Sequence, residues 1–198
     1  MIFEQLFDQK SSTYTYIIAS GEGREALIID PVIEHSDEYS TILKNLDLKL
    51  VKVIDTHIHA DHISALNELN KRTNCIRVMG EKSKSEVIDL RIKDGEKINV
   101  EEVELQAIYT PGHTDCSYSF LMNDRVFTGD TLLINGSGRT DFQNGNAYDA
   151  YDSIFNKLLK LPEKTFVFPA HDYNGKKFST IENEKNNNPR LQVSSKEE

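Results

Sequence analysis

Five of the six histidines stand in short polar segments beside other residue types that bind metals. The segment THIHADH carries three of them and an aspartate, and the later segments TPGHT, FTGDT and FPAHDY each add one more such residue. In chain order these residues are His57, His59, Asp61, His62, His113, Asp130 and His171. Imidazole nitrogens and carboxylate oxygens are the ligands that suit Zn and Fe. We therefore predict a metal site built from these four segments.

The three later segments each follow an apolar stretch, so a rigid sheet would aim their ligands at one point. A single histidine is usually structural, and a single aspartate after a strand is usually a cap or turn residue. These structural explanations would have to apply independently in each of the four segments. A common metal site explains all four segments together and is therefore favoured. His35, the sixth histidine, has no such neighbours and is predicted to be an exposed loop residue. A thiolate at Cys116 is a weaker interpretation, because no basic environment apart from nearby His113 is visible.

The apolar pattern predicts the elements that position these segments. Period-two alternation and turn residues predict strands over 13–19, 25–29, 48–54, 87–92, 102–109, 118–122, 125–128 and 165–168. Helical spacing predicts helices over 36–47, 63–73 and 146–160. An early and a middle run of strands with helices between them predicts two packed sheets with helices outside. A Rossmann domain is disfavoured, because no GxGxxG segment follows a strand.

Bulk properties narrow the class of protein. A chain of 198 residues predicts a single domain over residues 1–198, with 194–198 as a frayed tail. The net charge of -9 argues against nucleic acid and anionic membranes as partners. No signal peptide or membrane-spanning run is visible, and Cys75 and Cys116 form no CxxC pair or disulfide framework. We therefore expect a cytoplasmic protein with free thiols.

The order HxHxDH, GHT, GD and a late AHD resembles the signature of the metallo-β-lactamase superfamily over about residues 13–191. That resemblance implies an α+β fold, a four-layer αββα sandwich with the metal site along one edge of the sheets. Two further stretches, GRTDFQ and AHDY…STI…EK…NPRL, are similar to the persulfide dioxygenase (sulfur dioxygenase) branch. HxHxDH alone is shared with glyoxalase II, lactamases, lactonases and nucleases.

The narrower resemblance implies an iron-dependent dioxygenase that oxidises glutathione persulfide with O₂ to sulfite and glutathione. It implies one Fe(II) per chain, with ligands His57, His113 and Asp130. The remaining residues of the set would contact these ligands or hold a second metal: His59, Asp61, His62 and His171. The resemblance also allows a homodimer, and a sulfurtransferase partner would be a separate protein, because the chain has no rhodanese-like extension.

Three residues are expected to act on catalysis or substrate. Asp61 would orient a ligand and tune the iron. Arg139 of GRTDFQ and Tyr173 of AHDY would line the substrate side. Arg139 is suited to pair with a glutathione carboxylate, and its alternative is a structural ion pair within this acidic protein.

Two other functions stay open on the sequence. A dinuclear thioester hydrolase of the glyoxalase II type would bind two Zn or Fe ions, although the chain lacks room for the C-terminal helical domain that holds glutathione there. A non-catalytic module that senses a metal or a sulfur species would keep the fold without turnover. His and Asp suit Zn, Fe and Mn, so residue types leave the metal undecided.

Overall fold

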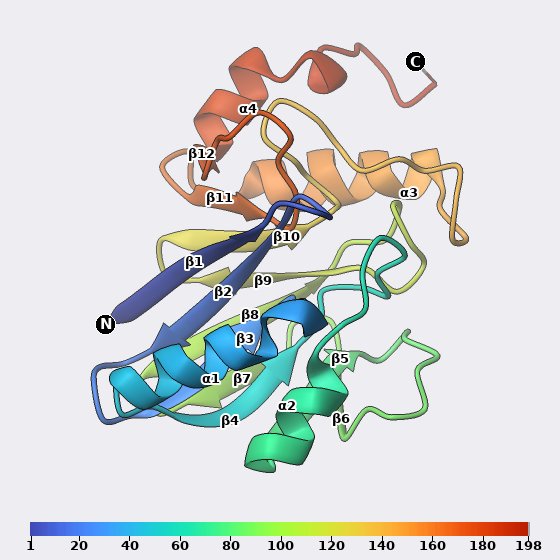
Figure 1. Cartoon of the computed structure of the whole chain (residues 1–198). Helices are drawn as coiled ribbons and strands as arrows, with labels where there is room; N and C mark the ends of the chain where they lie inside the picture. The colour runs from blue at the N-terminus through green and yellow to red at the C-terminus, as the bar shows by residue number, and fades with distance from the viewer. Residues whose placement is uncertain (198) are drawn as a thin grey trace.

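Two six-stranded sheets face each other in the computed structural model, which describes residues 1–197 (Figure 1). Glu198, the last residue of the tail predicted to be frayed, lies outside the described residues. The first sheet has the spatial order β1 (Ile2–Asp8), β2 (Thr13–Ala19), β3 (Glu25–Ile29), β4 (Lys49–Ile54), β5 (Ile76–Gly80) and β6 (Leu90–Ile92). The second has the order β12 (Ser179–Thr180), β11 (Phe166–Pro169), β10 (Arg125–Gly129), β9 (Tyr118–Met122), β8 (Val103–Tyr109) and β7 (Lys97–Val100).

Helices cover the outer face of each sheet. On the first sheet lie α1 (Ser36–Asn45), preceded by the short turn η1 (Ile33–His35), and α2 (Leu66–Thr73). On the second lie α3 (Ala147–Tyr151), η2 (Asp152–Lys157), η3 (Leu158–Lys160) and α4 (Ile181–Asn187), followed by the turn η4 (Pro189–Leu191). This is the predicted αββα sandwich. Within residues 1–197, every helix is too short or too polar to cross a lipid bilayer.

The core between the sheets is rich in aromatic side chains because both inner faces contribute large residues. Tyr16, Phe120 and Phe127 are each at most 1% exposed. Strand β8 shows the alternation that produces this core, since Val103, Leu105 and Ala107 point inward while Glu104 is exposed. Complete burial of one such large side chain stabilises the fold by roughly 1.5–3 kcal/mol. The two sheets are therefore a rigid base for the loops at their edge.

Most of the predicted elements are present with small shifts at their ends. The hairpin of β2 and β3 pairs antiparallel, with Ile17 opposite Ile28. The helix predicted over 146–160 is continuous in backbone direction, but its middle is wound as a π-helix and its end as a 3₁₀ turn. Asn146 caps its start by accepting from two backbone N–H groups. The predicted strand over 87–92 was too long, because only Leu90–Ile92 pairs with β5.

Four strands and one helix were missed by the sequence prediction: β1, β5, β7, β12 and α4. Strands β1 and β7 lie at sheet edges, where one side of the backbone faces solvent and the apolar pattern is diluted. Helix α4, with the sequence IENEKNN, buries Ile181 and Glu184, too few positions for an apolar stripe.

Candidate metal centre

Strand direction brings the four polar segments to one edge of the sandwich. Strands β3, β4 and β5 run parallel, and so do β10 and β11, so their carboxyl ends meet at the same place. His57 follows β4, Asp130 follows β10 directly, and His171 follows β11. His113 comes from the loop after β8. The site is thus built from both sheets.

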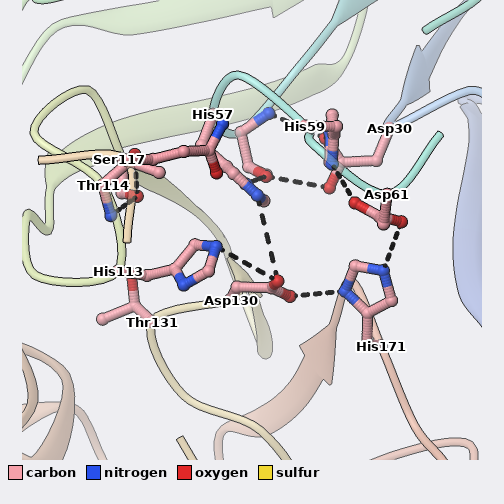
Figure 2. Close-up of polar contacts among 12 residues, drawn as sticks. Asp30, His57, His59, Asp61, His113, Thr114, Ser117, Asp130, Thr131 and His171 are labelled. Carbon is pink, nitrogen blue, oxygen red and sulfur yellow. Dashed lines mark hydrogen bonds and ion pairs between the residues drawn. The ribbon is translucent and has the colours of Figure 1, made fainter. Parts of the chain in front are cut away.

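Three ligand atoms converge at the centre of this edge (Figure 2). His57 Nε2 lies 3.9 Å and His113 Nε2 lies 3.5 Å from Asp130 Oδ2. One ligand atom from each residue lies within 4.8 Å of the other two. Asp130 is held as a carboxylate, because hydrogen bonding and charge from the surrounding histidines outweigh the effect of burial and lower its pKa.

In both His57 and His113, the hydrogen bond made by Nδ1 determines that Nε2 keeps its lone pair. Thr56 Oγ1 donates to Asp30 Oδ2, so it accepts from His57 Nδ1–H at 2.9 Å. His113 Nδ1–H donates to the carbonyl oxygen of Arg139 at 2.8 Å. Burial and the charge of neighbouring His59 lower the pKa of His57 to about 3, so its ring is neutral. Both Nε2 atoms therefore present lone pairs toward a carboxylate oxygen, an arrangement that a cation stabilises.

His171 lies between two carboxylates and contacts both. Its Nδ1 is 2.6 Å from Asp130 Oδ1, and its Nε2 is 2.9 Å from Asp61 Oδ2. Burial alone would lower the pKa of His171, but hydrogen bonds and charge from Asp130 and Asp61 outweigh it and raise the pKa to about 10. Both ring nitrogens then donate, and His171 acts as an imidazolium that orients the two carboxylates.

A second group of ligand atoms lies beside the first and comprises His59, Asp61 and His62. His59 Nε2 contacts Asp30 Oδ1 at 3.2 Å, and His62 Nδ1 contacts Asp61 Oδ2 at 2.8 Å. The opposite nitrogens, His59 Nδ1 and His62 Nε2, are buried without a hydrogen-bond partner. Burial opposes protonation of His59, but the carboxylate of Asp30 outweighs it and raises the pKa of His59 to about 9. Both groups could hold a metal ion. The group of His57, His113 and Asp130 is the better oriented, because hydrogen bonds fix the rings of both histidines.

Two glycines allow the loops to approach this closely. A Cβ at Gly129 would lie 2.6 Å from Thr56 Oγ1, and Gly129 has a φ of +53°. A Cβ at Gly138 would lie 2.1 Å from the carbonyl oxygen of Asp130 and 2.9 Å from His113 Nδ1. The N–H of Gly138 instead donates to that carbonyl oxygen at 2.9 Å. The glycines of FTGDT and GSGRT are therefore required by the geometry of the ligands.

The residues expected on the substrate side lie at the rim of the centre. The guanidinium of Arg139 is 64% exposed and makes a two-point contact with Asp141, at 2.7 and 3.0 Å. The ring of Tyr173 stacks parallel to that of His171, with centroids 6.1 Å apart, and is largely exposed. Asp61 lies on the open side between His62 and His171.

Sequence reasoning missed three residues that hold the centre together. Asp30 accepts from the backbone N–H of Thr56 at 2.7 Å, from its hydroxyl and from His59. Asp30 directly follows β3 with a φ of +50°, a left-handed conformation that is uncommon for residues other than glycine but tolerated by aspartate. Thr13 contacts His171 Nε2 at 3.1 Å.

The prediction that His35 is an exposed loop residue was wrong. His35 ends the turn η1, and its side chain is 30% exposed. Its two ring nitrogens contact Asp8 at 3.0 Å and Glu38 at 2.8 Å. Asp8 is distant from His35 in the sequence and meets it only through the fold, whereas Glu38 lies one helical turn further along the chain. The sequence alone therefore did not reveal these contacts. Cys75 and Cys116 are free, as expected, and both are buried.

Comparison with known proteins agrees with this geometry. The sequence profile described as Metallo-beta-lactamase superfamily matches residues 9–89 and 80–171. The chain therefore belongs to the metallo-β-lactamase superfamily. Mitochondrial persulfide dioxygenase ETHE1 of Mus musculus is 42% identical over all of this chain and 78% of its own length, and the human protein is 40% identical with the same coverage. Within the superfamily, the chain is a member of the persulfide dioxygenase family.

A solved structure supports the same placement. ETHE1 from Myxococcus xanthus matches with a TM-score of 0.97 and 47% sequence identity, covering all of this chain and 87% of that one. A hydroxyacylglutathione hydrolase of Dictyostelium discoideum is more distant, at 29% identity over 88% of this chain. The chain is thus an enzyme of a metal-dependent family, and its similarity to dioxygenases is greater than its similarity to this hydrolase.

Proposed function

We propose that this protein oxidises glutathione persulfide with O₂ to sulfite and glutathione, using one Fe(II) per chain. The observation that carries the proposal is the full-length similarity to persulfide dioxygenases, 42% in sequence and 0.97 in TM-score. Supporting it, the chain has the complete set of ligand-type residues at one sheet edge. The names of the curated relatives indicate a persulfide substrate. Glutathione as its carrier rests on the family resemblance, and the binding roles rest on the geometry of the site.

One metal position is favoured by the hydrogen bonds around the ligands. His57, His113 and Asp130 would hold the ion, because each has an oxygen or nitrogen lone pair directed at a common point. His171 has both ring nitrogens engaged by carboxylates, so it has no free lone pair for a second ion. Two histidines and one carboxylate leave positions open on a bound iron, which would supply the redox chemistry for O₂ and the persulfide sulfur.

The residues of the chain would orient and tune this centre. Thr56 and the Arg139 carbonyl fix the rings of His57 and His113, and His171 fixes the second oxygen of Asp130. Such contacts typically change metal affinity or activity by about 10- to 100-fold when they are removed. Asp61 would act by holding His171 and His62 in place on the open side.

A cleft beside the centre has three basic side chains that could bind the carboxylates of glutathione. It has a volume of about 470 Å³ and lies next to the loop 137–141 that holds His113. Arg139, Arg190 and Lys196 line it, together with the aromatic side chains of Tyr151 and Phe155. Arg139 would exchange its contact with Asp141 for a substrate carboxylate, and Tyr173 would flank the sulfur end near His171.

A dinuclear thioester hydrolase is the second candidate. The observation in its favour is that His59 Nδ1 and His62 Nε2 are buried without partners, as unoccupied ligand atoms of a second ion would be. The two carboxylate contacts of His171 oppose it, because they occupy both of its ring nitrogens. Two assays on the same purified protein separate the candidates: O₂ uptake with glutathione persulfide, and hydrolysis of a glutathione thioester. Uptake without hydrolysis supports the dioxygenase, and hydrolysis without uptake contradicts it.

Other properties stay predictions. The homodimer and the separate sulfurtransferase rest on the family resemblance. Cytoplasmic localisation rests on the sequence, and the names of the curated relatives say that those proteins are mitochondrial.

A further inference from the structure

A buried network of hydrogen bonds joins the C-terminal segment to the loop that precedes Arg139. Glu184 of α4 and Asn188, which follows that helix, are both 0% exposed. Glu184 Oε2 accepts from the backbone N–H of Asn135 at 2.9 Å and from Asn188 Nδ2 at 2.7 Å. Asn188 Nδ2 also donates to the carbonyl oxygen of Gly136 at 2.9 Å. Two side chains of the C-terminal segment thus hold the backbone of Asn135 and Gly136.

The carboxylate of Glu184 is held by uncharged donors. Its Oε1 accepts from the Ser179 hydroxyl and from Asn183 Nδ2. A buried carboxylate is costly unless its oxygens are hydrogen-bonded, so moving the loop would remove one donor, the Asn135 N–H, from a buried charge. The network therefore favours one fixed position of this loop. Ser179, Glu184 and Asn188 belong to the STI, EK and NPRL parts of the C-terminal stretch, and the proposed function assigns no role to these three residues.

Asn188 also holds the segment that carries Arg190. Its Oδ1 accepts from the backbone N–H of Arg190 at 3.0 Å and so caps the short turn η4. One side chain therefore bonds through its amide nitrogen to the loop before Arg139 and through its amide oxygen to the turn that carries Arg190. Arg139 and Arg190 both line the cleft of about 470 Å³ beside the metal centre. The contacts of Asn188 thus link the positions of two arginines that come from different parts of the chain.

The metal ligands have a separate anchor in the same loop. The N–H of Gly138 donates to the carbonyl oxygen of Asp130 at 2.9 Å. The carbonyl oxygen of Arg139 accepts from His113 Nδ1 at 2.8 Å. These two bonds do not involve the C-terminal segment. A change in the network therefore reaches the cleft without first breaking a bond that orients a metal ligand.

We propose that Asn188, held in place by Glu184, is a positioning residue that sets the spacing of Arg139 and Arg190 for a substrate with two carboxylates; this rests on the proposed function. Glutathione persulfide has two carboxylates, one at each end of the molecule. A carboxylate binds an arginine through charge-assisted and often bidentate hydrogen bonds. Two arginines at a fixed spacing bind both carboxylates at a smaller cost in entropy than two arginines on loops that move independently. Asn188 thereby raises the affinity for the substrate without touching it.

Two variants break the network at different points in the iron-loaded enzyme. Asn188→Ser keeps an oxygen that can cap the turn at Arg190, but its side chain is too short to reach Gly136. Glu184→Met keeps the length of the side chain and removes the acceptor for Asn135 and Asn188. Both variants leave every proposed metal ligand and both arginines of the cleft unchanged.

Two further variants serve as controls. Glu182→Met makes the same change on the exposed side of α4. Glu184→Gln is the conservative variant, because its amide oxygen can still accept from Asn135 and Asn188 while its amide nitrogen donates to the Ser179 hydroxyl. For each protein we measure iron content, KM and kcat for O₂ uptake with glutathione persulfide, and the Kd of glutathione by titration calorimetry.

The positioning role predicts full iron content, an unchanged kcat, and a KM and a glutathione Kd raised about tenfold in Asn188→Ser and Glu184→Met, the loss of about one charge-assisted contact. Glu184→Gln and Glu182→Met should keep the values of the parent. In an Arg139→Ala background, Asn188→Ser should raise KM further by about twofold or less, because the arginine that it positions is already gone.

An unchanged KM in folded, iron-loaded Asn188→Ser overturns the positioning role, and so does a rise in KM that is equally large in the Arg139→Ala background. Loss of folding or of iron in both Asn188→Ser and Glu184→Met also overturns it, since the network would then hold the fold or the metal and not the cleft. Absence of O₂ uptake by the parent instead contradicts the proposed function, and the Kd of glutathione still tests Asn188 by itself. A parent that does not bind glutathione contradicts both.

Discussion

Asp130 and His171 are joined by a contact of 2.6 Å between Oδ1 and Nδ1, while the other oxygen of Asp130 faces the Nε2 atoms of His57 and His113. One carboxylate thus connects the proposed iron ligands with the imidazolium beside them. This contact uses a ring nitrogen of His171 that would otherwise be available to a second metal. The contact between His171 and Asp130 therefore favours one metal ion at this centre over two.

Gly138→Ala should lower the iron content and the activity together. The new Cβ would lie 2.1 Å from the Asp130 carbonyl oxygen, so the loop that holds His113 must move. Gly136→Ala is the matched control, because its Cβ would meet Leu133 at an ordinary 3.7 Å. Metal analysis and O₂ uptake on both variants check this prediction. Full iron in Gly138→Ala would show that the close approach does not fix the ligands.

Arg139→Ala should raise KM for glutathione persulfide severalfold and change kcat little, if the guanidinium binds a remote carboxylate equally in the ground and transition states. The backbone carbonyl that orients His113 is kept in this variant. Asp141→Asn tests the same idea from the other side: it weakens the competing ion pair, so KM should stay unchanged or fall. An unchanged KM in folded Arg139→Ala would exclude the substrate role.

Cys75 and Cys116 should be dispensable for chemistry, because the proposed reaction uses a metal and not an enzyme thiol. Both thiols are buried, and burial raises the pKa of Cys75, which disfavours a reactive thiolate. The double Ser variant should keep most of its O₂ uptake. A single replacement that abolished uptake with iron fully loaded would require a covalent persulfide relay through that cysteine.

The His35 contacts should make stability depend on pH in a defined direction. Because the folded-state pKa of His35 is raised, its contribution is complete below about pH 6.5, the unfolded value, and is lost as pH rises through the raised pKa. The urea midpoints of the parent and His35→Gln should therefore differ most in mildly acidic buffer and converge in alkaline buffer. A difference that is constant with pH would mean that the ring acts by packing and not by charge.

The fold was predictable where apolar patterns are strong. Strands such as β2, β4 and β9 and the helix that begins at α3 lie within two residues of their predicted positions. Edge strands were not predictable, because β1 owes its place to pairing with β2 and not to its own alternation. Residue types alone do not show which distant strand provides a partner.

The grouping of the candidate ligand residues at one edge was predictable because several unusual side chains occur after strands, but the contacts that support them were not. Thr56 and Asp30 are common residue types, and their role depends on a loop that brings them within 3.0 Å of each other. His35 was misinterpreted for the same reason, since Asp8 meets it only through the fold. Contacts between ordinary residues far apart in the chain require the three-dimensional structure.

The number of metal ions bound per chain distinguishes a single-iron centre from a dinuclear one. Iron and zinc are measured in the freshly purified parent and in five variants: His57→Ala, His113→Ala, Asp130→Ala, His62→Gln and His171→Gln. We predict one iron per chain in the parent, almost none in the first three variants, and largely retained iron with reduced turnover in the last two. Two metal ions per chain in the parent, or loss of metal from His62→Gln or His171→Gln, would contradict the single-iron centre and favour the dinuclear hydrolase.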